Sequence, residues 1–510
     1  MKELIFYGDD ILVYDFPEQT RIFYAPKPLP PFGDEMAAIK EALENPIGSK
    51  RLEELLDENS QVVICFDDIC TPYPQMKNDV RAIAAEVVLE KLRVIGIKRE
   101  NLLFMCATGL HRKCKPKELA HILGKQVFRE YRERIFNHDA DDRENLVVLG
   151  KTKQGYDVEI NRFAAVADLI IYLNITSWPM SGGWKSIIVG LGSFKTIIPN
   201  HSPEVLMKGS MIDTQVSGLH RIIWEMGRIL KDKIQVFTIE MVLNNNLYSG
   251  LFEKLLRPLG ENNHKLPLWR RIALSTIRRL GFLKSYLMSR YKANYRLVGV
   301  YVGNIEQAHS HTLKLVKKQL IVPIDKQYDV VILGIPNLTP YTIGSVMNPL
   351  ILHMFVLGYF YNAYSGKPFL KKGGILIISN PAYEKFDPKQ HPSYIDFYHQ
   401  VLPRKPDIFN LKMVEKNYLD NEKYSEKYRT SYAYHGTHVL IAYYWGVLGL
   451  LKVGRVIIAG ANSRRVLDLL GFDYAKTLDD AIEVSQKYLG ENCSIAYFCM
   501  PPIWIAELEK

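Results

Sequence analysis

The chain contains little cysteine, with six residues among 510, at positions 65, 70, 106, 114, 493 and 499. None of them forms a CxxC pair, so the sequence gives no reason to expect a disulfide framework. Cys65 and Cys106 fall in or beside predicted buried strands, where a free thiol packs as a small apolar group. This use of cysteine predicts a reducing, cytoplasmic location.

Long apolar runs are also scarce. Val439–Leu451 is apolar but too short to span a bilayer. Met347–Tyr364 is longer but contains His353 and two asparagines, which suits a buried helix better. The first residues mix acidic with apolar side chains and do not have the layout of a signal peptide. We therefore expect no transmembrane segment and no signal peptide.

The net charge of +10 is concentrated in one segment, 257–296, which has ten lysines and arginines against the single acid Glu261. Apolar residues interleave with the arginines there, which predicts a basic amphipathic helix or helix pair broken near Gly281. Such a helix can cover the protein itself, or it can contact an acidic membrane surface or a partner protein. No recognised nucleic-acid module accompanies it, so nucleic-acid binding is not expected.

A chain of 510 residues is too long for one core, so two or three domains are expected. Its apolar fraction of 47% and charged fraction of 24% are those of a globular protein. Strands at 61–66, 101–107, 168–176 and 235–243 alternate with helices at 77–95 and 116–123. This alternation predicts an α/β fold with a mostly parallel sheet and helices outside it.

A second alternation of strands and helices begins near Arg296. It has strands at 297–302, 328–333, 374–379, 454–459 and, last, 494–499, with helices at 306–318 and 346–362. The sequence therefore predicts two α/β domains with mostly parallel sheets. The predicted divisions are 1–256 for the first domain, 257–296 for a basic helical insert or linker, and 297–510 for the second.

Polar residues follow several strands of the first unit. Asp68 follows the strand 61–66, and His111 follows a glycine turn after the next strand. Lys185 follows the turn Ser181-Gly182-Gly183, where the missing Cβ atoms would let the backbone pass close to a ligand. His201 comes sixteen residues later. In open α/β sheets, ligands bind beyond the carboxyl ends of strands. These residues could form an attachment point and a metal site, or simply a surface turn with a surface lysine and histidine.

A set of short motifs resembles the nickel-dependent lactate racemase family. The motifs are DDxxTP (Asp67–Pro72), ATGLHR (Ala107–Arg112), NHD (Asn137–Asp139), SGGWK (Ser181–Lys185), PNH (Pro199–His201) and GNIEQAH (Gly303–His309). The SGG-x-K sequence followed by a histidine is the most specific of them. The resemblance runs through most of the chain and implies a two-domain enzyme with its site in a cleft between the domains.

The resemblance also implies a cofactor, the nickel-pincer nucleotide, in which nickel is held by a pyridinium mononucleotide through sulfur and carbon. It places covalent attachment at Lys185 and the remaining nickel ligand at His201, a neutral imidazole that suits divalent nickel. Asp68, Thr71, Ser181, Gly182 and Gly183 complete the predicted cofactor-binding residues. Family members interconvert stereoisomers of 2-hydroxy acids by moving the C2 hydride to the cofactor and back. His111 occupies the position of the base that takes the hydroxyl proton.

The substrate end of the family pattern is not kept. The second histidine base, expected about ten residues before the lysine, is absent from the stretch that begins at Tyr172. The carboxylate-binding arginine is replaced by Thr71, and a Tyr-Gln-x-x-Lys group by residues 345–349. Residues that could replace the second base are Tyr172, Tyr341, His435 and His438. A tyrosine with a pKa near 10 would need strong perturbation to serve.

The sequence therefore predicts a nickel-pincer-nucleotide-dependent racemase or epimerase of a 2-hydroxy acid larger than lactate, or of a sugar acid. Its expected partners are that small-molecule substrate and the accessory enzymes that make the cofactor. Two alternatives remain. One is an oxidoreductase that transfers hydride on one face only, with His111 as its base. The other is a non-catalytic protein that binds the nucleotide and uses segment 257–296 for contact with a membrane or partner.

Overall fold

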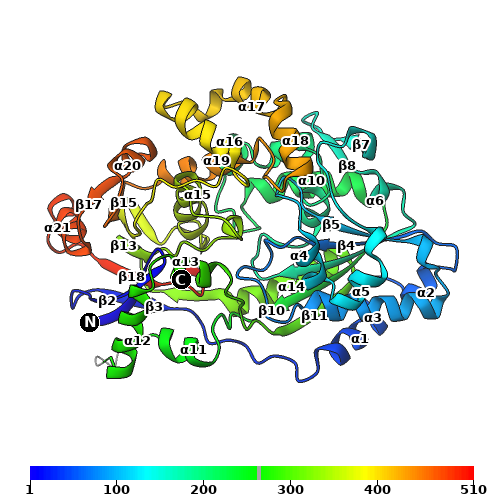
Figure 1. Cartoon of the computed structure of the whole chain (residues 1–510), viewed down its shortest axis with the longest axis horizontal. Helices are drawn as coiled ribbons and strands as arrows, with labels where there is room; N and C mark the ends of the chain where they lie inside the picture. The colour runs from blue at the N-terminus through cyan, green and yellow to red at the C-terminus, as the bar shows by residue number, and fades with distance from the viewer. Residues whose placement is uncertain (261–265, 510) are drawn as a thin grey trace.

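The computed structural model describes residues 1–260 and 266–509, which form two six-stranded sheets lying side by side (Figure 1). The first sheet has the order β11-β10-β9-β4-β5-β6, and only the pair β10–β11 is antiparallel. Its strands are β4 (Val62–Asp67), β5 (Leu102–Ala107), β6 (Ile135–Asn137), β9 (Leu169–Thr176), β10 (Val236–Leu243) and β11 (Leu297–Asn304). The predicted mixed α/β class with mostly parallel sheets is confirmed.

Both faces of the first sheet are buried, because alternate side chains of each strand point to opposite sides. Val62, Ile64 and Phe66 pack with one set of helices, and Val63 and Cys65 pack with another. The first set comprises α1 (Glu35–Glu44), α3 (Val80–Ile95), α4 (Pro116–Ile122) and α5 (Lys125–Glu130). The second comprises α7 (Trp184–Ile188), α8 (Phe194–Asn200), α9 (Pro203–Leu206), α10 (Gly218–Lys231) and α14 (Ile305–Leu320). This burial on two faces explains the nearly continuous apolar strands.

The second sheet is parallel throughout, with the order β17-β16-β15-β13-β18-β3. Its strands are β3 (Arg21–Tyr24), β13 (Tyr328–Gly334), β15 (Leu370–Ser379), β16 (Arg455–Ala459), β17 (Asp473–Ala475) and β18 (Ile495–Cys499). One face packs on α21 (Leu478–Leu489). The other faces α15 (Pro349–Met354), α16 (Pro392–Asp396), α19 (His438–Leu450) and α20 (Arg464–Leu470), and joins the same apolar core as the first sheet.

The two sheets do not divide the chain in the order predicted. The strand expected to open the second unit is β11, which pairs with β10 of the first sheet, and α14 packs on that sheet as well. Conversely, β3 near the N-terminus pairs with β18 of the second sheet. Periodicity shows that a strand exists but not which strand it pairs with, so this assignment was wrong. The domain boundaries at 256 and 297 stay a prediction, as does a cleft between two domains.

Two local predictions also need correction. The long helix expected at 346–362 is shorter and changes from α15 to a π-helical stretch, η5 (Phe355–Phe360). The strand β18 is not the last, because β19 (Ile505–Leu508) follows and lies between β12 (Ile321–Ile324) and β14 (Tyr364–Ser365) in a small parallel sheet.

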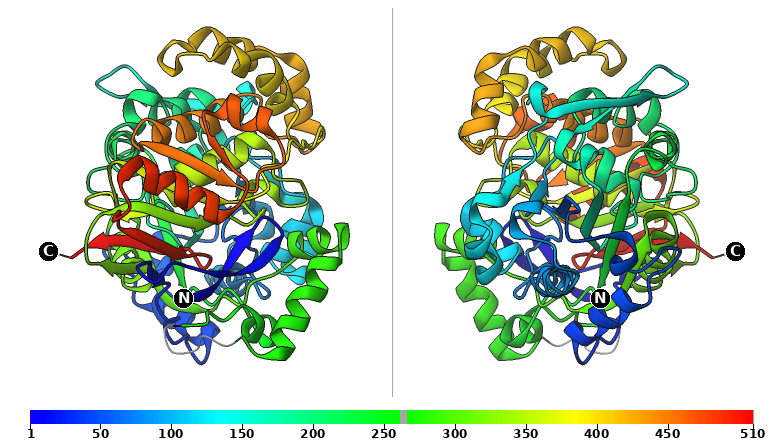
Figure 2. Two further views of the ribbon diagram at one scale, coloured as in Figure 1. Left: turned by 90° about the vertical axis from the view of Figure 1, so that its left-hand side faces the viewer. Right: turned by 90° about the vertical axis from the view of Figure 1, so that its right-hand side faces the viewer.

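The basic segment forms α12 (Leu268–Arg279) and α13 (Phe282–Ser289), separated at Gly281 as predicted; residues 261–265 of this segment lie outside the described residues. With α11 (Gly250–Leu256), these helices stand at the edge of the molecule beside the hairpin of β1 (Lys2–Tyr7) and β2 (Asp10–Asp15) (Figure 2). Lys284 binds Asp10, and Ser285 donates to Asp9. In the described part of the chain, no helix is long and apolar enough to span a membrane.

The remaining elements are short or peripheral. They are α2 (Leu52–Leu55), α6 (Arg162–Val166), α17 (Lys412–Leu419), α18 (Glu422–Thr430) and the hairpin of β7 (Leu146–Lys151) with β8 (Asp157–Asn161). Helices α17 and α18 lie across the upper edge of the molecule in Figure 1, above the region where the two sheets meet.

We predict that Gly446→Ala destabilises the protein by about 1–3 kcal/mol, because overpacking a buried contact forces its neighbours to shift. A Cβ atom at Gly446 would lie 2.0 Å from Nδ1 of the buried His353, where α19 meets α15. The measurement is the denaturant midpoint. Gly33→Ala is the control, because a Cβ atom there meets nothing within 4 Å. Equal midpoints for the two variants would contradict this packing.

Candidate functional site

Two adjoining cavities lie beyond the carboxyl ends of β4, β5 and β9. The first, which we call the polar cavity, has a volume of about 130 Å³ and is lined by Asp68, His111, Lys185, His201 and His438 among others. The second, which we call the apolar chamber, has a volume of about 240 Å³ and extends to Phe252 and Met288. They share a boundary formed by Thr71, His111, Met180, Ser181, Lys185, Tyr341 and Tyr359.

The structure brings nearly all the predicted site residues to the polar cavity. Its lining includes Asp68, Thr71, His111, Ser181, Gly182, Lys185 and His201. Gly183 does not line it, but faces a small neighbouring pocket together with Gly182 and Lys185. The residues come from loops after three adjacent strands, which explains how positions so far apart in sequence converge.

His111 is oriented by Asp68. The Nδ1 atom of His111 lies 2.8 Å from Oδ2 of Asp68, whose carboxylate is buried. The other carboxylate oxygen accepts a hydrogen bond from the Cys70 amide at 3.0 Å. A proton on Nδ1 shared with this carboxylate leaves Nε2 of His111 available as a base. The pair therefore has the geometry of a general base held by an acid.

Asp67 joins two of the strands that carry the site. Its Oδ2 accepts from the Ile175 amide at 2.7 Å, and its Oδ1 accepts from the Tyr172 hydroxyl at 3.2 Å. Burial raises the pKa of this carboxyl to about 7, although Arg81 and the two hydrogen bonds act in the opposite direction. The ends of β4 and β9 are thereby fixed beside each other.

Lys185 sits near the start of α7 with its side chain directed to both cavities. Its amine makes no hydrogen bond or ion pair with any residue that the structure describes. Desolvation lowers the pKa of Lys185 to about 8, against the attraction of Asp67 and Asp68. A substantial fraction of this amine is therefore neutral and nucleophilic near physiological pH.

His201 ends helix α8 and is buried. Its Nδ1 lies 3.2 Å from the carbonyl oxygen of Ile197, so that Nδ1–H donates there and Nε2 remains available. The ring stacks on Trp445, with centroids 5.9 Å apart and planes at 12°. Burial, and next the charge of Lys185, lowers the pKa of His201 to about 3. The imidazole is therefore neutral, the form that binds metals.

The glycine turn before Lys185 is held from behind by Glu240. This buried carboxylate on β10 accepts from the Gly183 amide at 2.7 Å, and its second oxygen lies 2.9 Å from Nδ1 of His309. Gly182 and Gly183 have φ values of +93° and +56°, and Cβ atoms on them would lie 2.9 Å and 2.7 Å from the His309 ring. This close packing therefore requires glycine at both positions, in addition to any need for the backbone to approach a ligand.

His438 is the best placed of the four predicted replacements for the second base. It lines the polar cavity, and its ring centroid lies 5.4 Å from that of His111. Its Nδ1 is 2.7 Å from the Tyr394 hydroxyl, which leaves Nε2 for a ligand. Burial, followed by the nearby His111, holds the pKa of His438 well below its usual value.

The other three candidates are engaged elsewhere. His435 binds Asp141 at 3.0 Å and Thr437 at 2.7 Å. Tyr341 shares a 2.6 Å hydrogen bond with Tyr359, and Tyr172 donates to Asp67. Burial raises the pKa of both Tyr172 and Tyr341 well above the usual value, so neither phenol is a base at neutral pH.

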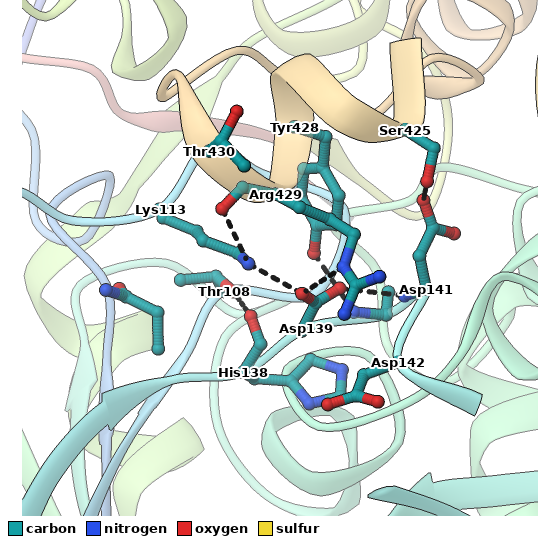
Figure 3. A network of polar contacts seen from close by, with 12 residues as sticks. Thr108, Lys113, His138, Asp139, Asp141, Asp142, Ser425, Tyr428, Arg429 and Thr430 are labelled. Atoms are coloured by element: carbon teal, nitrogen blue, oxygen red, sulfur yellow. Dashed lines mark hydrogen bonds and ion pairs between the residues drawn. The ribbon is translucent and has the colours of Figure 1, made fainter. Parts of the chain in front are cut away.

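The NHD motif has a positioning role in this structure. Asp139 binds Lys113 at 2.7 Å and Arg429 at 3.1 Å, and so ties the loops after β5 and β6 to helix α18 (Figure 3). The Tyr428 hydroxyl, from the same helix, donates to the Gly109 carbonyl at 2.9 Å. His138 is buried and lies 2.9 Å from the Gly192 carbonyl. These contacts hold α18 in place. The chain that follows α18 leads to His438, whose ring lies beside that of His111.

Among the described residues, one group of potential metal ligands is compact enough to hold an ion, namely Asp68, Cys70 and His111. Its geometry favours proton chemistry instead. Asp68 and His111 already bind each other, and burial raises the pKa of the Cys70 thiol well above its usual value. A metal bound there would have to break the contact between Asp68 and His111. It would also need the Cys70 thiolate, the form that binds metals, and burial opposes the formation of that thiolate.

Comparison with known proteins agrees with the motifs. Residues 7–212 match the lactate racemase N-terminal domain. The chain is 33% identical over 176 residues to the lactate racemase of Lactiplantibacillus plantarum, a match that covers 34% of this chain and 39% of that protein. It is 30% identical over 225 residues to the lactate racemase of Thermoanaerobacterium thermosaccharolyticum, covering 42% and 50%. The match thus spans half the length of these relatives or less.

The fold of the whole chain is also similar to a solved structure. The lactate racemase apoprotein from Thermoanaerobacterium thermosaccharolyticum superposes with a TM-score of 0.65 at 20% identity, covering 99% of this chain and 100% of that one. A Thermotoga maritima protein has a TM-score of 0.51 at 17% identity, covering 96% and 100%. These likenesses show a shared fold. Together with the N-terminal match, they confirm the resemblance to the lactate racemase family.

Several residues of the site were not singled out from sequence. Trp445 lies in an apolar run that was considered only as a membrane span, and Tyr394 and Tyr359 carry no motif. Asp67 belongs to the DDxxTP motif, but the resemblance implied a role for its neighbour Asp68. The GNIEQAH motif did point to His309, whose place behind the glycine turn only the packing shows.

We predict that acylation of Lys185 reaches half its maximal rate near pH 8, because only the neutral amine reacts and its pKa is lowered to about 8. An ordinary lysine titrates at about 10.4. Competitive labelling over a pH series, followed by peptide mass spectrometry, measures this rate. Lys185→Arg identifies the signal by removing it. A half-maximum near the ordinary value would contradict the desolvated site.

Proposed function

We propose that the chain is a nickel-pincer-nucleotide-dependent racemase or epimerase of a 2-hydroxy acid other than lactate. The observation that carries the proposal is the unpaired amine of Lys185, which shares one cavity with the neutral His201 imidazole and the Asp68–His111 pair. Burying a lysine without an ionic partner lowers the stability of the fold, so such a lysine in a cavity indicates a chemical role.

The residues fit this cofactor. Lys185 would hold it covalently, for which a neutral amine is needed, and His201 would bind nickel through Nε2. The bond from His201 to the Ile197 carbonyl sets the tautomer that leaves Nε2 unprotonated. When bound, the cofactor would accept the C2 hydride of the substrate and return it.

His111 would handle the accompanying proton. As the C2 hydride leaves, the substrate hydroxyl must lose its proton to become a carbonyl, and Nε2 of His111 accepts it. The resulting imidazolium is stabilised by the Asp68 carboxylate, 2.8 Å from Nδ1. When hydride returns to C2, His111 gives the proton back to the oxygen.

Inversion requires a proton carrier for the other orientation of the substrate, and His438 is our proposal for it. It lies next to His111 in the wall of the polar cavity, with ring centroids 5.4 Å apart, and is held through Nδ1 by Tyr394. Burial keeps it neutral in the protein without ligand. It is therefore able to accept a proton, although its low pKa makes it a weaker base than an exposed histidine.

The binding of the substrate carboxylate differs from that of the family pattern. Among the described residues that line the two cavities there is no arginine. Thr71 stands where the family arginine is expected, and it offers a hydroxyl without charge. A small anion such as lactate would lose its bidentate ionic partner here, so we propose a substrate that gains its affinity from other contacts.

A second candidate function is hydride transfer on one face only. The observation that favours it is the contrast between the two histidines: the buried Asp68 carboxylate lies 2.8 Å from Nδ1 of His111, whereas His438 has only the Tyr394 hydroxyl and its pKa is held well below the usual value by burial. In that case the keto acid would be released in place of the inverted alcohol.

We predict that the protein, co-produced with the cofactor-synthesis enzymes, carries a nucleotide-sized adduct and nickel. Lys185→Arg should abolish the adduct, because a protonated guanidinium is not nucleophilic and cannot form the covalent bond. His201→Ala should keep the adduct but lose most of the nickel. Intact-protein mass spectrometry and metal analysis measure both.

The matched control is Lys195→Arg, an exposed lysine outside both cavities, which should load normally. An unmodified, nickel-free protein, beside a lactate racemase that the same enzymes do load, would refute the cofactor assignment. Loading without turnover on any 2-hydroxy acid would instead indicate a cofactor-binding protein.

A further inference from the structure

We propose that the apolar chamber receives the tail of the substrate, which is therefore a 2-hydroxy acid with a long alkyl or arylalkyl chain. The inference rests on the proposed function, since it places the reacting carbon in the polar cavity. It adds the chemical class of the substrate, for which the motifs leave both larger hydroxy acids and sugar acids open.

The chamber is continuous with the place of reaction. Its inner end is formed by His111, Lys185 and Tyr341, which also line the polar cavity. Its far end is formed by Phe252 of α11 and Met288 of α13. A ligand with its hydroxyl at His111 thus has an adjoining space of about 240 Å³, larger than the 130 Å³ of the polar cavity.

The wall of the chamber suits hydrocarbon. Among the described residues that line it, His111 and Lys185 at the inner end are the basic ones, and no aspartate, glutamate or arginine is present. Several polar groups in the wall are paired within the protein, and of the lining side chains Trp178 Nε1 and Asn245 Oδ1 are buried without a partner among the described residues. The hydroxyls of Tyr291 and Tyr295 donate to the backbone carbonyls of Leu247 and Tyr73, at 3.0 Å and 3.2 Å.

Other occupants fit this wall less well. The hydroxyls of a sugar acid would lose water without gaining partners along most of the chamber, which is costly. An apolar tail loses nothing on leaving water, and its burial supplies affinity.

This source of affinity matches what the polar cavity lacks. With Thr71 in place of an arginine, the carboxylate contributes less to binding. Contacts remote from the reacting carbon can hold and orient a substrate while the chemistry proceeds elsewhere. The loss of the ionic contact and the presence of the chamber are therefore consistent with a single change of substrate class.

The test is the binding of 2-hydroxybutanoate, 2-hydroxyoctanoate and 2-hydroxyhexadecanoate to the full-length protein, below their micelle concentrations. We predict that Kd falls by up to about fourfold for each added CH2 until the chamber is filled. Met288→Trp, which fills the far end, should weaken binding of the longest acid by about tenfold and leave the shortest unchanged. Met413→Trp, at an exposed position on α17, is the matched control.

A second variant keeps the inference testable if Met288→Trp fails to fold. Phe252→Lys changes a side chain that is 41% exposed, so the fold should tolerate it, and it places a charge at the far end. It should also weaken binding of the longest acid. A Kd independent of chain length, or equal effects of Met288→Trp and Met413→Trp, would overturn the inference.

The two proposals fail in different ways. Chain-length-dependent binding without inversion of any acid by the cofactor-loaded protein would leave the chamber assignment standing and refute the reaction. Inversion of short acids, with no gain from longer tails, would support the reaction and overturn the chamber assignment.

A separate observation, on the outer face of α12, leads us to propose that this helix binds an anionic lipid surface. Leu268 is 70% exposed and Ile272 is 58% exposed. Arg271 follows Leu268 by three residues, and Arg278 and Arg279 follow Arg271 and Ile272 by seven residues each, so the arginines lie along or beside this stripe of the helix. None of these three arginines forms a salt bridge with a described residue, and residues 266–296 contain no acid.

The inner face of the same helix packs on the protein, as the alternative interpretation from sequence expected. Leu274 is buried with Leu4 and Phe6 of the N-terminal hairpin. Covering the protein and contacting a membrane are therefore functions of opposite faces. An apolar stripe flanked by unpaired cations complements anionic headgroups over an acyl layer.

The test is co-sedimentation with vesicles of phosphatidylcholine alone or mixed equally with phosphatidylglycerol. We predict binding to the mixed vesicles only, and a loss of roughly 30-fold or more in affinity for Arg271→Glu/Arg278→Glu. Arg129→Glu/Arg132→Glu, an exposed pair on another surface, should bind normally. No binding to mixed vesicles, or equal binding to both kinds, would overturn this proposal.

Discussion

The carboxylate of Asp67 is the contact on which the site depends. It lies at the end of β4, the strand between β9 and β5, and accepts hydrogen bonds from Tyr172 and Ile175 of β9. The chain leaves the sheet at this point toward Asp68 and Thr71, and the end of β9 leads to the glycine turn and Lys185. Because the strands are parallel, the segments that follow β4 and β9 leave the sheet at the same edge. Together with the parallel pairing of β4 and β9, this contact brings the amine, the imidazoles and the acid to one cavity.

The second half of the chain supplies the opposite wall. Helix α18 is held on the loops after β5 and β6 by Asp139, Arg429 and Tyr428. The chain then continues to His438 and, along α19, to Trp445 against His201. The first half therefore holds the groups that fit a cofactor, while the second determines what lies over them.

Sequence analysis predicted the parts of the fold that depend on local pattern. Parallel strands, their helices and the polar residues that follow them are visible in periodicity and composition, so Asp68, His111, Lys185 and His201 were found. Strand pairing could not be predicted, because nothing in the sequences of β3 and β11 indicates which sheet each strand joins. His438 could be proposed but not distinguished from His435, since the difference lies in the Asp141 partner of His435. The chamber walls come from distant segments and carry no motif.

The most direct test of the central claim is the fate of deuterium at C2 when the cofactor-loaded protein inverts a labelled 2-hydroxy acid in ordinary water. Acids of graded tail length, including lactate, should be followed by chiral chromatography and mass spectrometry. Our account predicts inverted product that keeps its deuterium, because hydride moves to the cofactor and back while His111 carries only the hydroxyl proton. Inversion with loss of the label to solvent would contradict it, since the C2 hydrogen would then leave as a proton.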